Sequence, residues 1–149
     1  MPKNTDTKTR SRMRRVNGKA GGKLEALAKS VADMAFRKKD PEVLIPARML
    51  SNVAFNEKTR HVEMGDAKQS RSFFNYGQAK RFMQTLLVAS KCKELIDRGK
   101  TASIRQIYYL SKHTIKGTNE KTFDDQAESD PIIEDVEVAI DALREELHV

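Results

Sequence analysis

The chain has a single cysteine, no tryptophan, few other aromatic residues and no long hydrophobic run. Cys92 has no partner for an intrachain disulfide, which fits a reducing cytosol without establishing one. The longest aliphatic run, residues 86–89, is far too short to cross a bilayer. The N-terminal residues are polar and basic with no apolar stretch behind them, so we expect no signal peptide and no membrane partner. These absences favour a cytoplasmic protein.

What the chain has in excess is positive charge, unevenly distributed. The net charge is +7, but residues 1–117 carry 26 Lys/Arg against 10 Asp/Glu, a balance of +16. Residues 118–149 carry 2 against 11, a balance of −9. A basic body favours a polyanionic partner, because each phosphate that it neutralises releases counterions. The acidic end has two possible partners: another protein, or a basic surface of the same chain.

The N-terminal part predicts a tail and then an arm. Residues 1–23 hold eight Lys/Arg and three glycines without apolar periodicity, so we expect a disordered basic tail. A 3.6-residue apolar period predicts a helix over residues 24–36, which Pro41 ends. Strand-like segments follow, and residues 56–58 suit a turn. The arm, residues 24–68, is therefore expected to be this helix plus a β-hairpin or small sheet built from segments 43–45, 52–55 and 61–64.

Residues 69–149 predict a mainly helical domain. A long helix is expected from about Tyr76 to Asp97, with Gly99 as its C-terminal cap. A short helix follows Ser103, and a third is expected to begin at Asp130. Three helices, the first two tightly joined, match a helix-turn-helix core. We therefore expect an α+β, mostly helical chain with a winged-helix, CAP-like domain; a wing would follow the third helix, and we expect none before the chain ends.

The most informative segment is the run Arg105-Gln106-Ile107-Tyr108-Tyr109. Ser103 suits the N-cap of a short helix, and Gln106 stands three residues on, where a capping box requires it. Residues four apart share a helix face, so Arg105 lies under Tyr109 while the apolar stripe turns Tyr108 inward. A phenol with cations nearby can act as a nucleophile toward phosphate. Tyr109 is the candidate nucleophile and Arg105 its cation.

Other residues with chemical potential have plainer uses. His61 and His148 show no ligand spacing with Cys92 or each other, so we expect no metal site in this chain. The acidic residues between 124 and 130 lack the calcium-loop pattern, which leaves helix capping and solvation. Six further side chains are candidate DNA contacts, although a solvated basic face explains the last four almost equally well: Lys112, His113, Lys68, Arg71, Lys80 and Arg81.

From about Glu42 to Val149 the sequence resembles the A subunit of archaeal DNA topoisomerase VI, a family related to the meiotic protein that makes recombination-initiating double-strand breaks. The resemblance runs through Ile45-Pro46-Ala47-Arg48, Ser51-Asn52-Val53, Arg71-Ser72-Phe73, Lys80-Arg81-Phe82-Met83-Gln84-Thr85, Val88-Ala89-Ser90-Lys91-Cys92-Lys93-Glu94-Leu95, Lys112-His113-Thr114-Ile115, Gly117-Thr118 and Glu128-Ser129-Asp130-Pro131-Ile132-Ile133-Glu134-Asp135. Matches of this length are specific, whereas a lone Arg-x-x-Tyr-Tyr would not be.

The resemblance implies a function. In the family the second tyrosine of the motif attacks DNA, which corresponds to Tyr109, and the motif arginine corresponds to Arg105. The residue after that arginine is commonly acidic in the family and is Gln106 here, so this chain lacks a carboxylate at that position. The implied reaction is ATP-dependent double-strand cleavage through a 5′-phosphotyrosyl link, strand passage and religation, which relaxes supercoils.

The resemblance also implies cofactors and partners. Mg²⁺ is held in the family by a Toprim domain through a glutamate and an Asp-x-Asp pair; this chain contains no Asp-x-Asp, and we expect that domain to be absent from it. ATP is bound by the B subunit. The implied partners are double-stranded DNA, a second copy of the A subunit and the B subunits of an A2B2 heterotetramer, in a nucleoid-associated setting. Without the metal-binding domain and the B subunit, we expect this chain to bind DNA but to cleave it poorly or not at all.

Two rival interpretations remain. The first is a non-catalytic helix-turn-helix DNA-binding protein, whose DNA binding would not change on substitution of Tyr109. Its third helix would enter a DNA groove, but the third predicted helix of this chain is acidic, which argues against that interpretation. A small basic RNA-binding protein would need exposed aromatic stacking platforms. Aromatic residues are only 6% of this chain, which argues against that interpretation.

Overall fold

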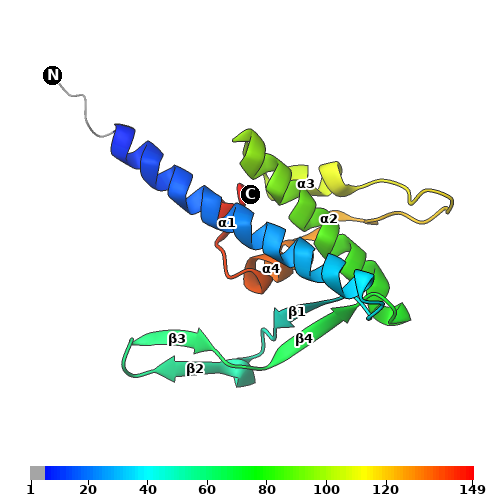
Figure 1. The fold of residues 1–149 in the computed structure, drawn as a ribbon, viewed down its shortest axis with the longest axis horizontal. Helices are drawn as coiled ribbons and strands as arrows, with labels where there is room; N and C mark the ends of the chain where they lie inside the picture. The colour runs from blue at the N-terminus through cyan, green and yellow to red at the C-terminus, as the bar shows by residue number, and fades with distance from the viewer. Residues whose placement is uncertain (1–5) are drawn as a thin grey trace.

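The computed structural model describes the backbone of residues 6–149 and the side chains of residues 19–149. In the described part of the chain, four helices form the body: α1 (Asp6–Phe36), α2 (Tyr76–Arg98), α3 (Ile104–Ser111) and α4 (Gln126–Ala139). The long helix α1 runs across α2, and α2 also contacts both shorter helices, α3 and α4 (Figure 1). The main core is made of apolar side chains from the four helices, the segment between α3 and α4 and the last turn of the chain, with Val88, Ile107, Phe123, Ile133 and Leu147 fully buried. No helix of the described part combines the length and the apolar character that a membrane span needs.

Helix α1 is longer than the sequence predicts. The expectation of a disordered tail over residues 1–23 is wrong for residues 6–23, which are helical, while residues 1–5 lie outside the described part. The reason is visible near the expected boundary, where Ala20 is buried and Gly21 packs closely on α2. A Cβ on Gly21 would lie 3.6 Å from Cγ2 of Ile96. Small residues thus let α1 contact α2 at positions 20 and 21, where the sequence has no large apolar side chain to reveal the contact.

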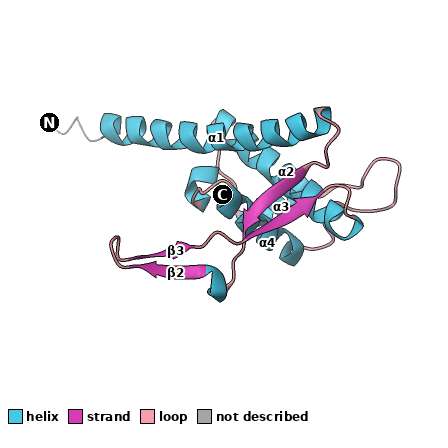
Figure 2. Ribbon diagram, turned by 60° about the horizontal axis from the view of Figure 1, so that its bottom comes forward, coloured by secondary structure: helices cyan, strands magenta, loops and turns pink. Residues whose placement is uncertain are grey.

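The strands form two separate antiparallel pairs (Figure 2). Strands β2 (Val53–Asn56) and β3 (His61–Met64) make the predicted hairpin, which is confirmed. Strand β1 (Glu42–Pro46) pairs instead with β4 (Lys68–Ser72), a strand that the polar sequence of residues 68–72 did not suggest. Val43 and Ile45 of β1 are buried with Phe82 and Val31 in a second, smaller core cluster. Asn52 joins the two pairs, because its side chain donates to the carbonyls of Ala47 and Ala67 and accepts from the amide of Ala67.

The predicted α2 and α3 are confirmed, including Gly99 in the left-handed conformation after α2. The third helix differs from the prediction, because α4 begins at Gln126 with Asp125 as its cap, and Pro131 lies inside it. The sequence carried that signal, since Asp125 is followed three residues later by Glu128. Helix α4 ends at Ala139, and a 3-10 turn, η2 (Arg144–Leu147), completes the fold. The mixed α+β class is therefore confirmed, and the winged-helix assignment stays a prediction.

One backbone conformation at the end of α1 yields a stability prediction. Lys38 has φ of +56°, a left-handed conformation that costs a residue with a Cβ about 1 kcal/mol relative to glycine. Lys38→Gly is expected to raise the free energy of unfolding by about 0.5–1 kcal/mol, measured by urea denaturation. Lys38→Ala removes the same charge but keeps the Cβ and should bring no such gain. An equal gain in both variants would assign the effect to charge and contradict the conformational argument.

Candidate functional site

Helix α3 is short and is fixed at its N-terminus by side chains. The backbone amide of Gln106 donates to the Ser103 hydroxyl at 3.2 Å, and the backbone amide of Ser103 donates to the side-chain Oε1 of Gln106 at 2.8 Å. This is the predicted capping box, and it satisfies two amides that the helix itself leaves unpaired. Ile107 and Tyr108 then point into the core, as predicted, with 0% and 7% of their surfaces exposed. The orientation of α3 is therefore fixed, and the face opposite Ile107 and Tyr108 is exposed to solvent.

Tyr109 lies on that outer face. Its side chain is 59% exposed, and the guanidinium carbon of Arg105, one turn earlier, lies 5.9 Å from the centre of its ring. The rings of Tyr108 and Tyr109 are 5.1 Å apart and tilted by 56°. A guanidinium over a phenol ring is held there by cation–π attraction and keeps donors available for a further anion. The phenol is thus presented to solvent with a cation beside it.

The neighbouring Tyr108 has its hydroxyl engaged. The Lys112 ammonium donates to it at 2.5 Å, and the hydroxyl donates to the backbone carbonyl of Asp124 at 3.3 Å. The same ammonium lies 4.9 Å from the ring centre of Tyr108. The hydrogen bond to Tyr108 is the main cause that raises the pKa of Lys112 above its ordinary value. Lys112, predicted as a DNA contact, therefore uses at least one of its N–H donors in a hydrogen bond within the chain.

The C-terminal end of α3 rests on buried polar side chains that the sequence did not single out. The Thr122 hydroxyl donates to the carbonyl of Ser111 at 2.8 Å and accepts from the amide of His113 at 3.0 Å. Gln84 of α2 donates to the Thr122 carbonyl at 2.7 Å and to Glu128 at 2.8 Å. His113 also places Nδ1 3.1 Å from the Ser111 carbonyl. Gln84 and Thr122 are fully buried, so they hold the segment after α3 in place.

The other predicted DNA contacts have different surroundings. Lys80 lies 2.8 Å from Asp124 and 3.0 Å from Glu128, and these hydrogen bonds, that to Asp124 first, raise its pKa. Arg71, on β4, is mostly buried and lies 3.4 Å from Asp135 of α4. Lys68 and Arg81 are exposed. Lys80 and Lys112 thus both lie beside Asp124, close to Tyr108, whereas Arg71 pairs with Asp135 of α4.

The acidic residues and the cysteine serve structural purposes. Asp125 caps α4 by accepting from the Glu128 amide at 3.0 Å, and Glu128 accepts from the Asp124 amide at 2.8 Å, as the capping interpretation predicted. Cys92 is fully buried, and burial raises the pKa of its thiol to about 12, which leaves it unreactive. Among the described side chains, no three His, Cys, Asp or Glu residues gather in a way that could hold a metal ion.

Comparison with known proteins adds a family. Residues 80–149 match the family model described as Type IIB DNA topoisomerase. The chain is 47% identical, over 85% of its length and 33% of the relative's, to the A subunit of Type 2 DNA topoisomerase 6 from Pyrococcus horikoshii. The corresponding proteins of Hyperthermus butylicus and Methanothermobacter thermautotrophicus are 39% and 38% identical, over 80% and 84% of this chain and 33% and 34% of theirs.

The chain belongs to the family of topoisomerase VI A subunits. The resemblance predicted from the sequence is thereby confirmed. The part matched by the family model includes α2 from Lys80 onward, α3 and α4, so it contains Arg105 and Tyr109. The chain spans about one third of the length of the curated relatives it matches.

The capping box at the start of α3, the helix that carries Tyr109, is expected to stabilise the fold. Ser103→Ala removes the acceptor for the Gln106 amide and should lower the free energy of unfolding by about 1 kcal/mol, measured by urea denaturation. Ser103→Asp keeps an acceptor at the cap and should lose much less. No loss in Ser103→Ala, or a loss of the same size in Ser103→Asp, would mean that the acceptor at the cap does not stabilise α3.

Proposed function

We propose that this chain is the tyrosine-bearing portion of the A subunit of a type IIB DNA topoisomerase, which binds duplex DNA and supplies Tyr109 as the nucleophile. The observation that carries the proposal is the contrast within α3: the Tyr109 phenol is exposed beside Arg105, while the Tyr108 hydroxyl is bonded to Lys112 and Asp124. Only one of two adjacent tyrosines is free to meet a phosphate. The names of the relatives support DNA as the substrate.

The proposed chemistry is a transesterification. The Tyr109 phenol oxygen attacks a backbone phosphorus, and the bond from phosphorus to the 3′ oxygen breaks. The phenol proton leaves to solvent or a base, and the departing 3′ oxygen takes up a proton. A 5′-phosphotyrosyl link and a free 3′-hydroxyl result, and attack by that hydroxyl reverses the step. Arg105, 5.9 Å from the ring centre, would stabilise negative charge on the pentacoordinate phosphorus, which is the kind of interaction that lowers such barriers most.

The remaining parts of the activity are proposed to come from outside this chain. The letter in the relatives' names implies at least one other kind of subunit, and we propose an A2B2 assembly in which the two copies of the tyrosine cut opposite strands and B binds ATP. Mg²⁺ would be held outside the described residues, since these contain no metal-binding cluster, and would stabilise charge on the transferring phosphoryl group. Alone, the chain is expected to bind DNA and to cleave it poorly. A nucleoid-associated, cytoplasmic setting fits this function.

The decisive experiment locates the covalent bond. The chain is combined with a metal-binding half, the B subunit, Mg²⁺, ATP and supercoiled DNA, and the reaction is stopped with denaturant. Trypsin should release residues 106–112 as one peptide, because it cleaves after Arg105 and after Lys112. Fragmentation in the mass spectrometer should then place the nucleotide on Tyr109. A nucleotide on Tyr108, or adducts confined to another peptide, would overturn the proposal.

A further inference from the structure

Three aromatic side chains gather in exposed positions where β4 leads into α2. Phe73, Phe74 and Tyr76 expose 48%, 71% and 100% of their surfaces. The Phe73 ring lies 5.6 Å from the buried Phe82 ring and 5.4 Å from Phe74, so it connects the exposed rings to the core. A single exposed aromatic residue needs no explanation, but three within four positions of the chain are unusual. The low aromatic content of the chain conceals this local concentration.

A basic turn is fastened beside the aromatic residues. Helix α1 ends at Phe36, and the next three residues, Arg37, Lys38 and Lys39, are all exposed. Asp40 then accepts from the Phe74 amide at 3.0 Å and from the Ser72 hydroxyl, and the Phe73 amide donates to the Pro41 carbonyl at 2.9 Å. The carboxylate of Asp40 is occupied by these bonds. These bonds hold the segment that follows the three cations against the segment that carries Phe73 and Phe74.

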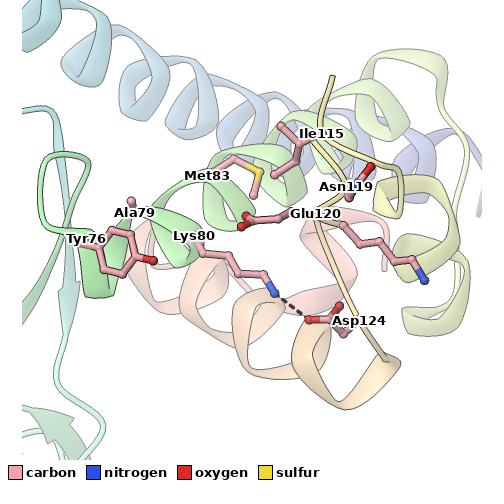
Figure 3. A pocket seen from close by; sticks show the side chains of 9 residues that line it. Tyr76, Ala79, Lys80, Met83, Ile115, Asn119, Glu120 and Asp124 are labelled. Carbon is pink, nitrogen blue, oxygen red and sulfur yellow. Dashed lines mark hydrogen bonds and ion pairs between the residues drawn. The ribbon is translucent and has the colours of Figure 1, made fainter. Parts of the chain in front are cut away.

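Tyr76 also stands beside a cavity of about 680 Å³ between the start of α2 and the segment after α3 (Figure 3). Ala79, Met83 and Ile115 give it an apolar wall. Its charges balance, with Lys80 and Lys121 against Glu120 and Asp124, and Lys80 lies 2.8 Å from Asp124. The cavity is apolar on one side, has hydrogen-bond donors and acceptors on the other, and carries no net charge. It therefore suits a flat, neutral ring with polar edges. It does not suit a phosphate.

We infer that this region binds single-stranded nucleic acid, with phosphates along the turn at residues 37–39, bases stacked on Phe74 and Tyr76, and one base edge in the adjoining cavity. Cations that track a backbone and aromatic faces that take any base are the standard combination for unpaired strands. An acidic protein segment would also be drawn to the cations, but it would leave the neutral cavity without use. The inference goes beyond the proposed cleavage of duplex DNA, which requires no unpaired base. It needs neither Tyr109 nor a partner chain.

The test compares ligands that differ in one property. Fluorescence anisotropy of the full chain is measured with a 15-nucleotide oligo-dT, an abasic 15-mer with the same phosphates and a polyglutamate peptide. The variant Phe74→Ala/Tyr76→Ala should weaken oligo-dT binding at least about tenfold and leave abasic binding unchanged. Phe55→Ala, at an aromatic residue 63% exposed on β2, is the matched control and should change neither. Arg37→Gln/Lys38→Gln/Lys39→Gln should reduce the salt slope of log K by about 2.

Several results would overturn the inference. Equal affinity for the abasic and oligo-dT strands, or unchanged oligo-dT binding by the double aromatic variant, would remove the stacking role. Polyglutamate binding that depends on Phe74 and Tyr76 as strongly as oligo-dT binding would make the region a docking surface for acidic protein. Tyr109→Phe should bind oligo-dT normally. A failure of the adduct experiment with stacking intact would therefore reject only the proposed function, and the reverse pattern only this inference.

Discussion

Tyr109→Phe is expected to abolish the covalent protein–DNA adduct completely, because phenylalanine lacks the oxygen that would join phosphorus. The structure gives no reason for the variant to fold differently, since Tyr109 is 59% exposed and its hydroxyl has no bonded partner within the described part of the chain. The measurement is the denaturant-trapped adduct of the assembled enzyme. Binding of uncleaved duplex should stay within about twofold of the wild type, so the variant separates chemistry from binding.

The matched control is Tyr108→Phe. This variant should keep the adduct while losing the bonds from Lys112 and to Asp124, at a cost of about 1 kcal/mol in the free energy of unfolding. The two changes are chemically identical and one position apart, so nonspecific effects should be shared. If Tyr108→Phe lost the adduct and Tyr109→Phe kept it, the assignment of the nucleophile from helix geometry would be refuted.

The sequence predicts the local part of this arrangement well. Which face Tyr108 and Tyr109 take follows from the 3.6-residue period and from Ser103 and Gln106, all within seven positions. The hairpin of β2 and β3 is predictable for the same reason, because the pairing partners are close in the chain. Whether Tyr109 meets phosphate is untested by the structure and stays a prediction.

Features that depend on distant contacts were not predictable from the sequence. The contact of α1 with α2 at positions 20 and 21 uses small residues, and β4 is a strand because β1 pairs with it, although residues 68–72 are polar. The support of α3 by Gln84 and Thr122 joins positions 38 apart. The exposed patch around Phe74 is likewise hidden, because a sequence gives aromatic content but not which rings the core leaves outside.

The second large effect is expected at Asp135, on the inner side of α4. Its carboxylate is 5% exposed and lies 2.7 Å from Arg48 and 3.4 Å from Arg71. Removing one member of such a buried group leaves uncompensated charge, so Asp135→Asn should lower the free energy of unfolding by about 3–5 kcal/mol. That is a large share of the about 5–15 kcal/mol typical of folded domains. Urea denaturation, with the midpoint and slope fitted separately, measures it.

Glu134→Gln is the control, because Glu134 is the adjacent residue, pairs with the same Arg48 and is 49% exposed. An exposed pair contributes about 0–1 kcal/mol, so the two variants should differ severalfold. Equal losses would mean that burial of Asp135 carries no special cost.

A third variant decides whether Arg71 serves the fold or DNA binding. If α4 rather than DNA holds it, Arg71→Gln should destabilise the fold as Asp135→Asn does. If Arg71 served DNA, that variant would weaken duplex binding and leave the urea midpoint unchanged.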